Sequence, residues 1–358
     1  MSWEYVALGE LYEVHNGLSK GGKFFGKGSP FLSFSTVFNK WFLPQELLDL
    51  VQSTDNEQQS YSILRGDVFI TRTSETMDEL GMSSVALKDY PHATYNGFTK
   101  RLRPINPERV LPEFIGYYLR TPVFRAGFTA FSTMTTRASL RNEDLLSMKV
   151  PVPDMQTQKH IASILSAYDD LVENNQKQIK LLEEAAQRLY KEWFVDLRFP
   201  GHENTKITDG IPEGWTRCAL GDLIDFNPKV SPSKERKKQS VPMSALSTSS
   251  MTLDMAEVYT TESNAGSKFQ NGDTLLARIT PCLENGKTAF VAGIEAQEGA
   301  VGSTEFIVMR SRRLNPYMVY LLARTDDFRN SAINSMTGSD GRQRAQVDKL
   351  QALPHLEP

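Results

Sequence analysis

The stretch that most constrains this fold runs from about Gln156 to Val195 and contains neither glycine nor proline. Pro151 and Pro153 precede it in a segment suited to extended backbone, and Pro200-Gly201 end it. Within it, one set of mostly apolar residues recurs at steps of three and four, the spacing of one face of an α-helix. We call this set the seam: Ile161, Ile164, Tyr168, Leu171, Asn175, Ile179, Leu182, Ala186, Leu189 and Trp193.

A helix of this extent would be about 60 Å long at ~1.5 Å per residue, which exceeds an ordinary domain helix. Its narrow seam predicts pairing with a second helix. The periodicity alone equally allows a long core or linker helix. Asn175 is polar where an apolar residue is expected. It either fixes the register of a helix pair or faces solvent, and the sequence leaves both open.

The segments before and after this stretch repeat one another. Matching residues occur in the same order in both, and their separation shortens slightly at each step, as expected for one domain duplicated with diverged loops. The matched pairs are Trp3–Leu11 with Trp215–Leu223, Arg65–Arg72 with Asn271–Arg278, and Pro112–Arg125 with Pro316–Arg329. Several ordered matches indicate a duplication, whereas a single match would not.

Each copy predicts a mixture of strands and helices. Apolar runs follow a Gly-Asp turn at 66–71 and at 272–277, which is typical of strands. A helix with proline in its first turn is expected later in each copy. Strands and helices without regular alternation favour an α+β class, with two similar globular domains joined by a long coiled-coil-type helix. The predicted boundaries are 1–150, 151–199, 200–350 and 351–358.

The central stretch also carries a family pattern. A Pro-x-Pro motif leads into IASILSAYDDLVENN at 161–175, then a helix rich in Leu, Glu and Ala, then YKEWFVDLRFP at 190–200 and a new domain starting at Gly-Trp. This order resembles the central conserved region of the specificity subunit of Type I restriction–modification systems. The resemblance implies a non-catalytic subunit that recognises double-stranded DNA through two target-recognition domains held apart by antiparallel conserved helices.

The resemblance also implies partners. These are modification (methyltransferase) subunits, which bind adenosylmethionine, and restriction subunits, which use ATP; neither cofactor is expected on this chain. The chain ends at LQALPHLEP, where the family pattern would continue into a second helix. We therefore expect the seam to be covered by another chain, including a second copy in a homodimer, or to stay partly exposed. The alternative function is an interaction or regulatory protein acting through that helix.

Composition narrows the setting. The net charge of -3 excludes a bulk polycation, so any nucleic-acid site must be a local basic surface. Two cysteines in no pairing motif favour a reduced, cytoplasmic protein. No apolar run approaches the ~18 residues of a membrane span, and the first residues, MSWEYVALGEL, do not resemble a signal peptide.

Candidate DNA contacts are basic residues in Gly- and Ser-rich loops, where side chains can approach phosphates. They are Lys20, Lys23, Lys27, Arg72, Arg137, Arg141, Lys234, Arg236, Lys237, Lys238, Arg278, Arg342 and Arg344. Arg72 and Arg278 occupy equivalent positions of the repeat, and arginine suits bidentate recognition of guanine. For Arg72 and Arg278 the alternative is an ion pair within each domain, and for 234–238 it is a solvated loop.

No catalytic set emerges from the sequence. Phe24–Gly28 formally matches an adenosylmethionine-binding motif, but no Asn-Pro-Pro-aromatic motif accompanies it. The near phosphate-binding loop at 21–28 has Gly28 in place of Ser or Thr, and Pro30 where a helix is required. The five histidines lie at no metal-ligand spacing. A self-contained methyltransferase, the remaining hypothesis, would require this chain alone to bind adenosylmethionine.

Overall fold

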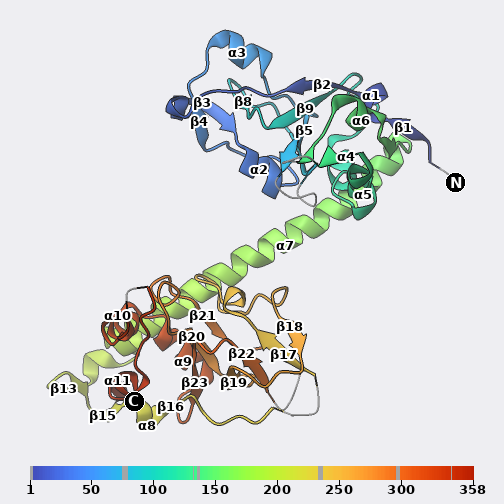
Figure 1. Cartoon of the computed structure of the whole chain (residues 1–358). Helices are drawn as coiled ribbons and strands as arrows, with labels where there is room; N and C mark the ends of the chain where they lie inside the picture. Colours follow the sequence, from blue (N-terminus) through green and yellow to red (C-terminus); the bar gives the residue numbers. More distant parts are fainter. Residues whose placement is uncertain are drawn as a thin grey trace. The chain divides into compact units, whose positions relative to one another are not determined.

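Figure 1 shows the computed structural model of the whole chain. The structure describes residues 3–74, 80–131, 133–134, 138–232, 237–295, 299–339 and 341–358. It divides into two compact units, Met1–Glu173 (unit 1) and Asn174–Pro358 (unit 2). Each unit mixes strands and helices, which confirms the predicted α+β class. In the described part of the chain, no helix combines the length and apolar character that crossing a bilayer requires.

Unit 1 is built on a four-stranded antiparallel sheet with the order β2-β9-β5-β7 and a three-stranded sheet with the order β4-β3-β8. Two small sheets, β1-β12 and β10-β11-β6, complete it. The strands are β1 (Tyr5–Ala7), β2 (Tyr12–Asn16), β3 (Phe25–Leu32), β4 (Asp49–Val51), β5 (Val68–Thr71), β6 (Thr73–Ser74), β7 (Ser83–Val85), β8 (Thr94–Tyr95), β9 (Thr99–Pro104), β10 (Thr133–Met134), β11 (Ala138–Ser139) and β12 (Lys149–Pro151). The helices are α1 (Leu8–Leu11), α2 (Phe34–Asn39), α3 (Asp55–Ser60), α4 (Pro112–Tyr118), α5 (Pro122–Phe131) and α6 (Asn142–Ser147).

The buried strand β5 contributes to two of the hydrophobic cores of unit 1, one on each face of its sheet. Successive side chains of a strand point to opposite faces of its sheet. Val68 and Ile70 therefore join the core that contains Ile115 of α4, whereas Phe69 joins the core that contains Tyr95. All five side chains are 0% exposed. A strand buried on both faces reads as a continuous apolar run, as the sequence does here.

Unit 2 repeats this plan. One four-stranded sheet has the order β16-β23-β20-β21, and a second sheet, with one strand more than its counterpart in unit 1, has the order β18-β17-β22-β19. The strands are β13 (Ile207–Thr208), β14 (Ile211–Pro212), β15 (Thr216–Ala219), β16 (Ile224–Phe226), β17 (Lys238–Val241), β18 (Tyr259–Thr261), β19 (Ser267–Phe269), β20 (Thr274–Ala277), β21 (Thr288–Phe290), β22 (Ala300–Gly302), β23 (Phe306–Ser311) and β24 (Pro354–Glu357). The helices are α8 (Leu220–Leu223), α9 (Pro316–Ala323), α10 (Asp326–Asn334) and α11 (Val347–Gln351). The matching strand order confirms the duplication.

One further element, α7 (Met155–Tyr190), is a single helix of 36 residues, followed by a π-helical turn at Lys191–Val195. It confirms the long helix predicted from the seam. Its first turn is capped by Asp154, whose carboxylate accepts from the backbone N–H of Thr157 at 2.9 Å. Near its end the Tyr190 side chain is 3% exposed within the core of unit 2. The boundary between the two units falls inside this helix.

Candidate nucleic-acid interface

Arg72 and Arg278 lie at the same structural position in their units. The N–H of Arg72 donates to the carbonyl of Phe98 at 3.0 Å, and its own carbonyl accepts from Leu140 at 3.1 Å. Arg278 makes the same two contacts, with Glu305 and Ala345, both at 2.9 Å. In each unit the second of these hydrogen bonds connects the end of a central strand with the loop that precedes the last short helix. The backbone hydrogen bonds therefore confirm the equivalence of Arg72 and Arg278 that the repeat predicted.

The surroundings of the two arginines differ. In unit 2, Glu305 accepts from Arg344 at 2.7 Å, and this hydrogen bond, with the charge of Arg278 nearby, lowers the pKa of the Glu305 carboxyl. Arg278 itself donates to the carbonyl of Ala345 at 3.3 Å. In unit 1, the position of Glu305 is taken by Phe98, which is 53% exposed. In unit 2 the ion pair with Glu305 is thus made by Arg344, and Arg278, for which the ion-pair alternative was raised, acts on Glu305 through its nearby charge. Unit 1 has an exposed aromatic ring where unit 2 has this carboxylate.

The three lysines of the first Gly-rich loop have different environments. Lys20 forms an ion pair with Glu57 at 2.7 Å and lies over the ring of Phe24. Lys23 is exposed and lies over the same ring, 5.1 Å from its centroid. Lys27 is exposed on β3, and no helix follows it there, which excludes the phosphate-binding loop. Lys23 and Lys27 therefore offer accessible charges, whereas Lys20 is held by Glu57.

The remaining candidates divide by accessibility. Arg141, Lys237 and Arg342 are exposed, and Arg141 is the N-cap residue of α6. Lys238 is 4% exposed on β17, where its ammonium donates to Asn264 at 2.8 Å, so it presents no charge at the surface. The lysine-rich run predicted a solvated loop or a DNA contact, and alternation along a strand turns this one side chain inward. Arg137, Lys234 and Arg236 lie outside the described residues.

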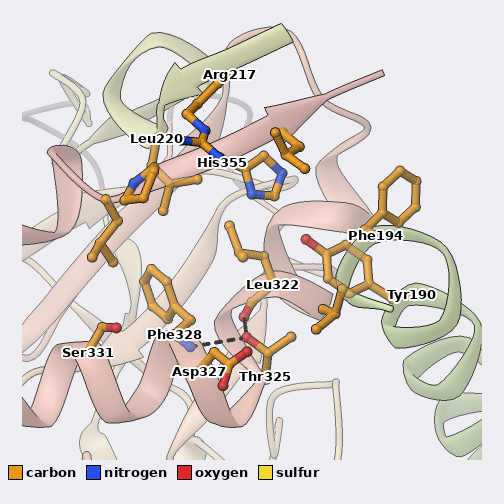
Figure 2. Close-up of a pocket in the computed structure, with 14 residues that line it drawn as sticks. Tyr190, Phe194, Arg217, Leu220, Leu322, Thr325, Asp327, Phe328, Ser331 and His355 are labelled. Carbon is orange, nitrogen blue, oxygen red and sulfur yellow. Dashed lines mark hydrogen bonds between the residues drawn. The ribbon is translucent and has the colours of Figure 1, made fainter. Parts of the chain in front are cut away.

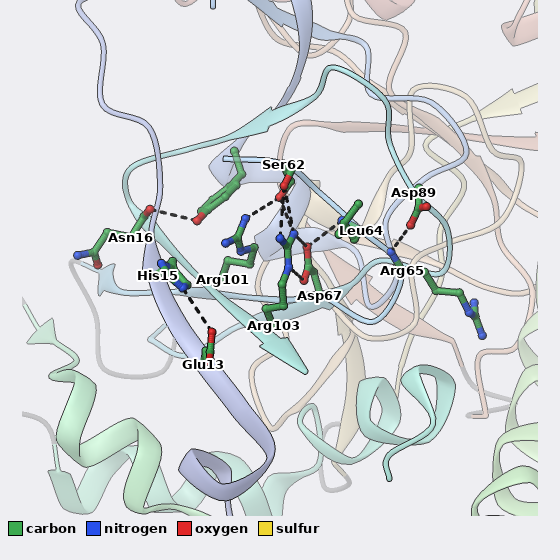
Figure 3. Close-up of polar contacts among 11 residues, drawn as sticks. Glu13, His15, Asn16, Ser62, Leu64, Arg65, Asp67, Asp89, Arg101 and Arg103 are labelled. Atoms are coloured by element: carbon green, nitrogen blue, oxygen red, sulfur yellow. Dashed lines mark hydrogen bonds and ion pairs between the residues drawn. The ribbon is translucent and has the colours of Figure 1, made fainter. Parts of the chain in front are cut away.

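Sequence reasoning missed a buried ion pair that both units share. Asp67 is 0% exposed and pairs with Arg103 at 2.6 Å, and Asp273 is 1% exposed and pairs with Arg310 at 2.6 Å. Figure 3 shows Arg103 directed at Asp67, with Ser62 next to both side chains. The signal was the repeated Gly-Asp, which we interpreted only as a turn before a strand.

The glycines of this repeated motif have a backbone reason. Gly66 and Gly272 have φ of 90° and 91°, a region that side chains disfavour. The Asp after each glycine also accepts from a backbone N–H three residues before it, at 2.8 Å in both units. The motif therefore closes a turn and places a buried aspartate in an ion pair with a partly buried arginine, which makes it part of the fold and not of the interface.

Two more basic side chains on β9 were also missed. Arg101 is 3% exposed and donates to the carbonyl of Ser62 at 2.7 Å (Figure 3). It also lies over the ring of Tyr95. Lys100 is 5% exposed and donates to the side-chain oxygen of Asn142. Neither burial could be predicted from the sequence, because TKRLRP at 99–104 has the composition of a solvated charged segment.

A cavity of about 480 Å³ lies within unit 2 (Figure 2). Tyr190 and Phe194 line one side of it, and Arg217 and His355 line another. Burial lowers the pKa of His355. The Thr325 hydroxyl accepts from the N–H of Phe328 and donates to a carbonyl, which is a helix-capping role. Among the residues that the structure describes, no group of His, Cys, Asp and Glu could hold a metal ion.

The seam of α7 is largely open to solvent. Six of its apolar side chains are between 46% and 69% exposed: Ile164, Tyr168, Leu171, Ile179, Leu182 and Leu189. Ile161, Ala186 and Trp193 are partly buried, and Asn175 is exposed. Other side chains of the helix hold it to its units. In unit 1 the Asp169 carboxylate accepts from Tyr117 at 2.7 Å, and in unit 2 Glu183 accepts from the N–H of Met251 at 2.9 Å.

Comparison with known proteins places these features in context. A family model described as "Type I restriction modification DNA specificity domain" matches residues 1–184. The chain is 34% identical over 145 residues to the type I restriction enzyme MjaIX specificity subunit of Methanocaldococcus jannaschii, covering 39% of this chain and 33% of that relative. It is 33% identical over 139 residues to the EcoAI specificity subunit of Escherichia coli, covering 37% of this chain and 23% of that relative. The chain thus matches a third or less of the length of these relatives.

A solved structure supports the fold over nearly the whole chain. The S subunit of a Type I restriction–modification system from M. genitalium superposes with a TM-score of 0.55 and 12% sequence identity, covering 99% of this chain and 84% of that one. At 12% sequence identity, this similarity supports the fold alone. It agrees with an α+β chain in which a long helix links two similar units.

Proposed function

This chain belongs to the family of Type I restriction modification DNA specificity domains, and from that premise we propose that it is the DNA-recognition subunit of such a system. The observation that carries the proposal is the duplicated unit, which has an arginine at the same structural position in both copies. Two similar readers in one chain suit a target made of two half-sites. The chain would have no chemistry of its own, and it would act in the cytoplasm.

The long helix gives the proposal a geometric consequence. A helix of 36 residues rises about 54 Å at ~1.5 Å per residue. Double-stranded DNA rises ~3.4 Å per base pair, so this length corresponds to at most about 16 base pairs. We expect the bases between the two half-sites to be recognised by their number and not by their sequence, because a helix can set a distance but cannot contact each base.

The chemistry would come from partners. Modification subunits would bind adenosylmethionine and methylate an adenine within the target, which requires that base to leave the stack. Restriction subunits using ATP would cleave under the direction of the same recognition. The exposed seam supports a docking role, because six large apolar side chains on one helix face are costly to leave in water. A second helix, from another copy of this chain or from a partner subunit, would cover it.

One observation favours a second candidate function. The same exposed seam would let the chain pair with an intact specificity subunit and block assembly of the complex. Sedimentation of the chain with and without the modification subunit separates the two. A recognition subunit forms a larger complex with the modification subunit, whereas a regulatory chain pairs with specificity subunits and excludes it.

The deciding experiment is to co-express the chain with its modification subunit and map methylated adenines by sequencing. We expect two short sequences at a fixed separation. Methylation without a bipartite sequence would overturn the proposal. Adenosylmethionine binding by this chain alone, measured by calorimetry, would instead support a self-contained methyltransferase.

The arginines allow a test at one half-site. Arg72→Ala should weaken recognition of the half-site that unit 1 contacts by roughly 1–3 kcal/mol if Arg72 contacts a base. Arg278→Ala should do the same for the other half-site and serves as the matched control. Binding to DNA targets with each half-site altered in turn gives the measurement. Unchanged affinity in both variants would assign the two arginines a role within the fold.

A further inference from the structure

The two units place different side chains at one equivalent position of the central sheet. Lys100 on β9 is paired in register with Ile70 of β5. In unit 2 the corresponding residue on β23 is Ile307, paired with Leu276 of β20. Paired residues of adjacent strands have their side chains on the same face of the sheet. Lys100 and Ile307 therefore occupy equivalent strand positions, and their side chains lie on the equivalent face of the sheet in each unit.

The neighbour that each of them meets also differs. Lys100 donates a hydrogen bond to Asn142, the first residue of α6. The first residue of α11 is Val347, a partly buried side chain that packs against the hydrophobic cluster to which Ile307 belongs. The two short helices are aligned by the matching backbone bonds that precede them, from Leu140 to Arg72 and from Ala345 to Arg278. A polar pair in unit 1 thus stands where unit 2 has an apolar pair.

The Lys100–Asn142 pair is energetically unusual because it buries a charged group. Lys100 is 5% exposed, and its burial, together with the charge of Arg72, lowers the pKa of its ammonium group. Removing an ammonium from water is costly unless it is fully paired, and the Arg72 charge has the same sign. Unit 2 shows that Ile and Val at these positions build the same fold, with Ile307 0% exposed. The fold therefore does not require Lys100 and Asn142.

The chemistry of the pair indicates what it is for. An ammonium group only donates, so the Asn142 atom that faces Lys100 must be the amide oxygen. This fixes the orientation of the amide, and Asn142 is exposed. An oriented asparagine amide can donate to N7 and accept from N6 of adenine in the major groove. The exposed Arg141 lies beside it in sequence, where a positive charge can contact a phosphate.

We propose that Asn142 recognises an adenine in the half-site bound by unit 1, and that Lys100 is the positioning residue that orients its amide. The inference rests on the proposed function, because it presupposes that unit 1 contacts a DNA half-site. Unit 2 presents only the methyl groups of Val347 at the same place and does not recognise adenine there. The two half-sites consequently differ at the base pair that these positions face.

The first test transplants the apolar pair from unit 2 into unit 1. The double variant Lys100→Ile/Asn142→Val is assembled with the modification subunit, and its thermal unfolding is compared with that of the wild-type complex. We expect equal or higher stability, since a buried charge is replaced by packed side chains. We also expect discrimination in favour of adenine at one position of one half-site to fall roughly 5- to 150-fold, with the other half-site unchanged.

The second test uses a single exposed substitution, so that it does not depend on the core. Asn142→Asp keeps the acceptor for Lys100 but removes the amide donors. The preference at that base pair should move from adenine toward cytosine, whose N4 amino group donates to a carboxylate. A role confined to stability would leave the preference unaltered. Glu143→Gln, at the exposed neighbouring position of α6, is the matched control and should preserve the adenine preference.

The measurements are binding to a panel of DNA targets with every base at each half-site position, and the map of methylated sites. A variant complex that folds and keeps the wild-type preference at every position of both half-sites overturns this inference while leaving the proposed function standing. A wild-type complex that binds no defined sequence removes the proposed function, and this inference with it.

Discussion

At the scale of single residues, the Asp67–Arg103 pair shows how this fold accommodates charge inside a sheet. Asp67 is fully buried, and Arg103 is mostly buried and donates to it with two nitrogens. Breaking a buried pair costs more than the pair itself contributes, because the remaining charge is left in a poorly solvated site. The repetition of the pair as Asp273–Arg310 in unit 2 means that each unit carries the same vulnerability.

We therefore expect Asp67→Ala to destabilise unit 1 by about 3–5 kcal/mol, measured by urea unfolding. The double variant Asp67→Leu/Arg103→Met should recover most of that loss, because it removes both charges together. Glu4→Ala is the control, since the Glu4–Arg109 pair lies at the surface, at 3.7 Å, and should matter little. If the double variant were as unstable as Asp67→Ala, lost packing and not the unpaired charge of Arg103 would explain the loss of stability.

Glu305 gives unit 2 a pH dependence of known sign. Hydrogen bonding to Arg344 lowers the pKa of its carboxyl below the ordinary value of 4.5. The native state then holds that proton less tightly than the unfolded chain, so the contribution is present above 4.5 and is lost as pH falls through the lowered pKa. Glu305→Gln should flatten this part of the stability curve, measured by urea unfolding between neutral and acidic pH. Parallel curves for variant and wild type would contradict this prediction.

For the basic residues, some positions could be predicted from the sequence, whereas burial and ion pairing could not. The equivalence of Arg72 and Arg278 followed from an ordered repeat, because aligned repeats carry residues to the same place in a fold. The burial of Lys238 and Lys100 did not follow, because both lie in charged segments whose strand alternation is hidden by neighbouring polar residues. The ion pair of Arg344 needed Glu305, which is close in space but distant in sequence. DNA contact by any of these residues stays a prediction.

At the scale of elements, α7 was the easiest part of the chain to predict. Its period, its bounding prolines and the lack of glycine are local signals, and they placed both ends within a few residues of the observed helix. The π-helical turn at 191–195 has no such signal, and the aromatic packing of Phe194 with Tyr190 and Trp215 is tertiary. The seam was predicted as an apolar stripe, and its exposure in a single chain agrees with a surface that another helix covers.

The seam makes a prediction about association. Leu171→Glu/Leu182→Glu places charges on side chains that are 52% and 69% exposed, so the stability of the chain should change by less than about 1 kcal/mol. Pairing with a second helix should weaken strongly, because the same charges would be buried there. Sedimentation with the modification subunit measures the pairing. Ala162→Glu is the contrasting control, since Ala162 is 5% exposed and a charge there should disrupt unit 1 itself. Unimpaired assembly of the double variant would remove the seam as a docking surface.

At the scale of the whole molecule, duplication was predictable and topology was not. Ordered matches between the two segments need only the sequence, whereas the order β2-β9-β5-β7 depends on which strands pair across long loops. The structure adds that the hydrophobic cores are separate. The clusters around Ile70 and Tyr95 lie in unit 1, and those around Leu276 and Phe269 lie in unit 2. Separate cores allow each unit to unfold as its own cooperative body.

A matched pair of substitutions tests this independence. Ile70 is 0% exposed and Leu276 is 1% exposed, at equivalent positions of β5 and β20. Ile70→Ala and Leu276→Ala each remove buried methyl groups and should cost about 2–5 kcal/mol in their own unit. Calorimetry should show two transitions in the wild-type chain, with a different one lowered in each variant, and hydrogen exchange should assign each to its unit. A single transition lowered equally by both substitutions would mean that α7 couples the units into one cooperative body, and a change made in one unit would then disturb the other.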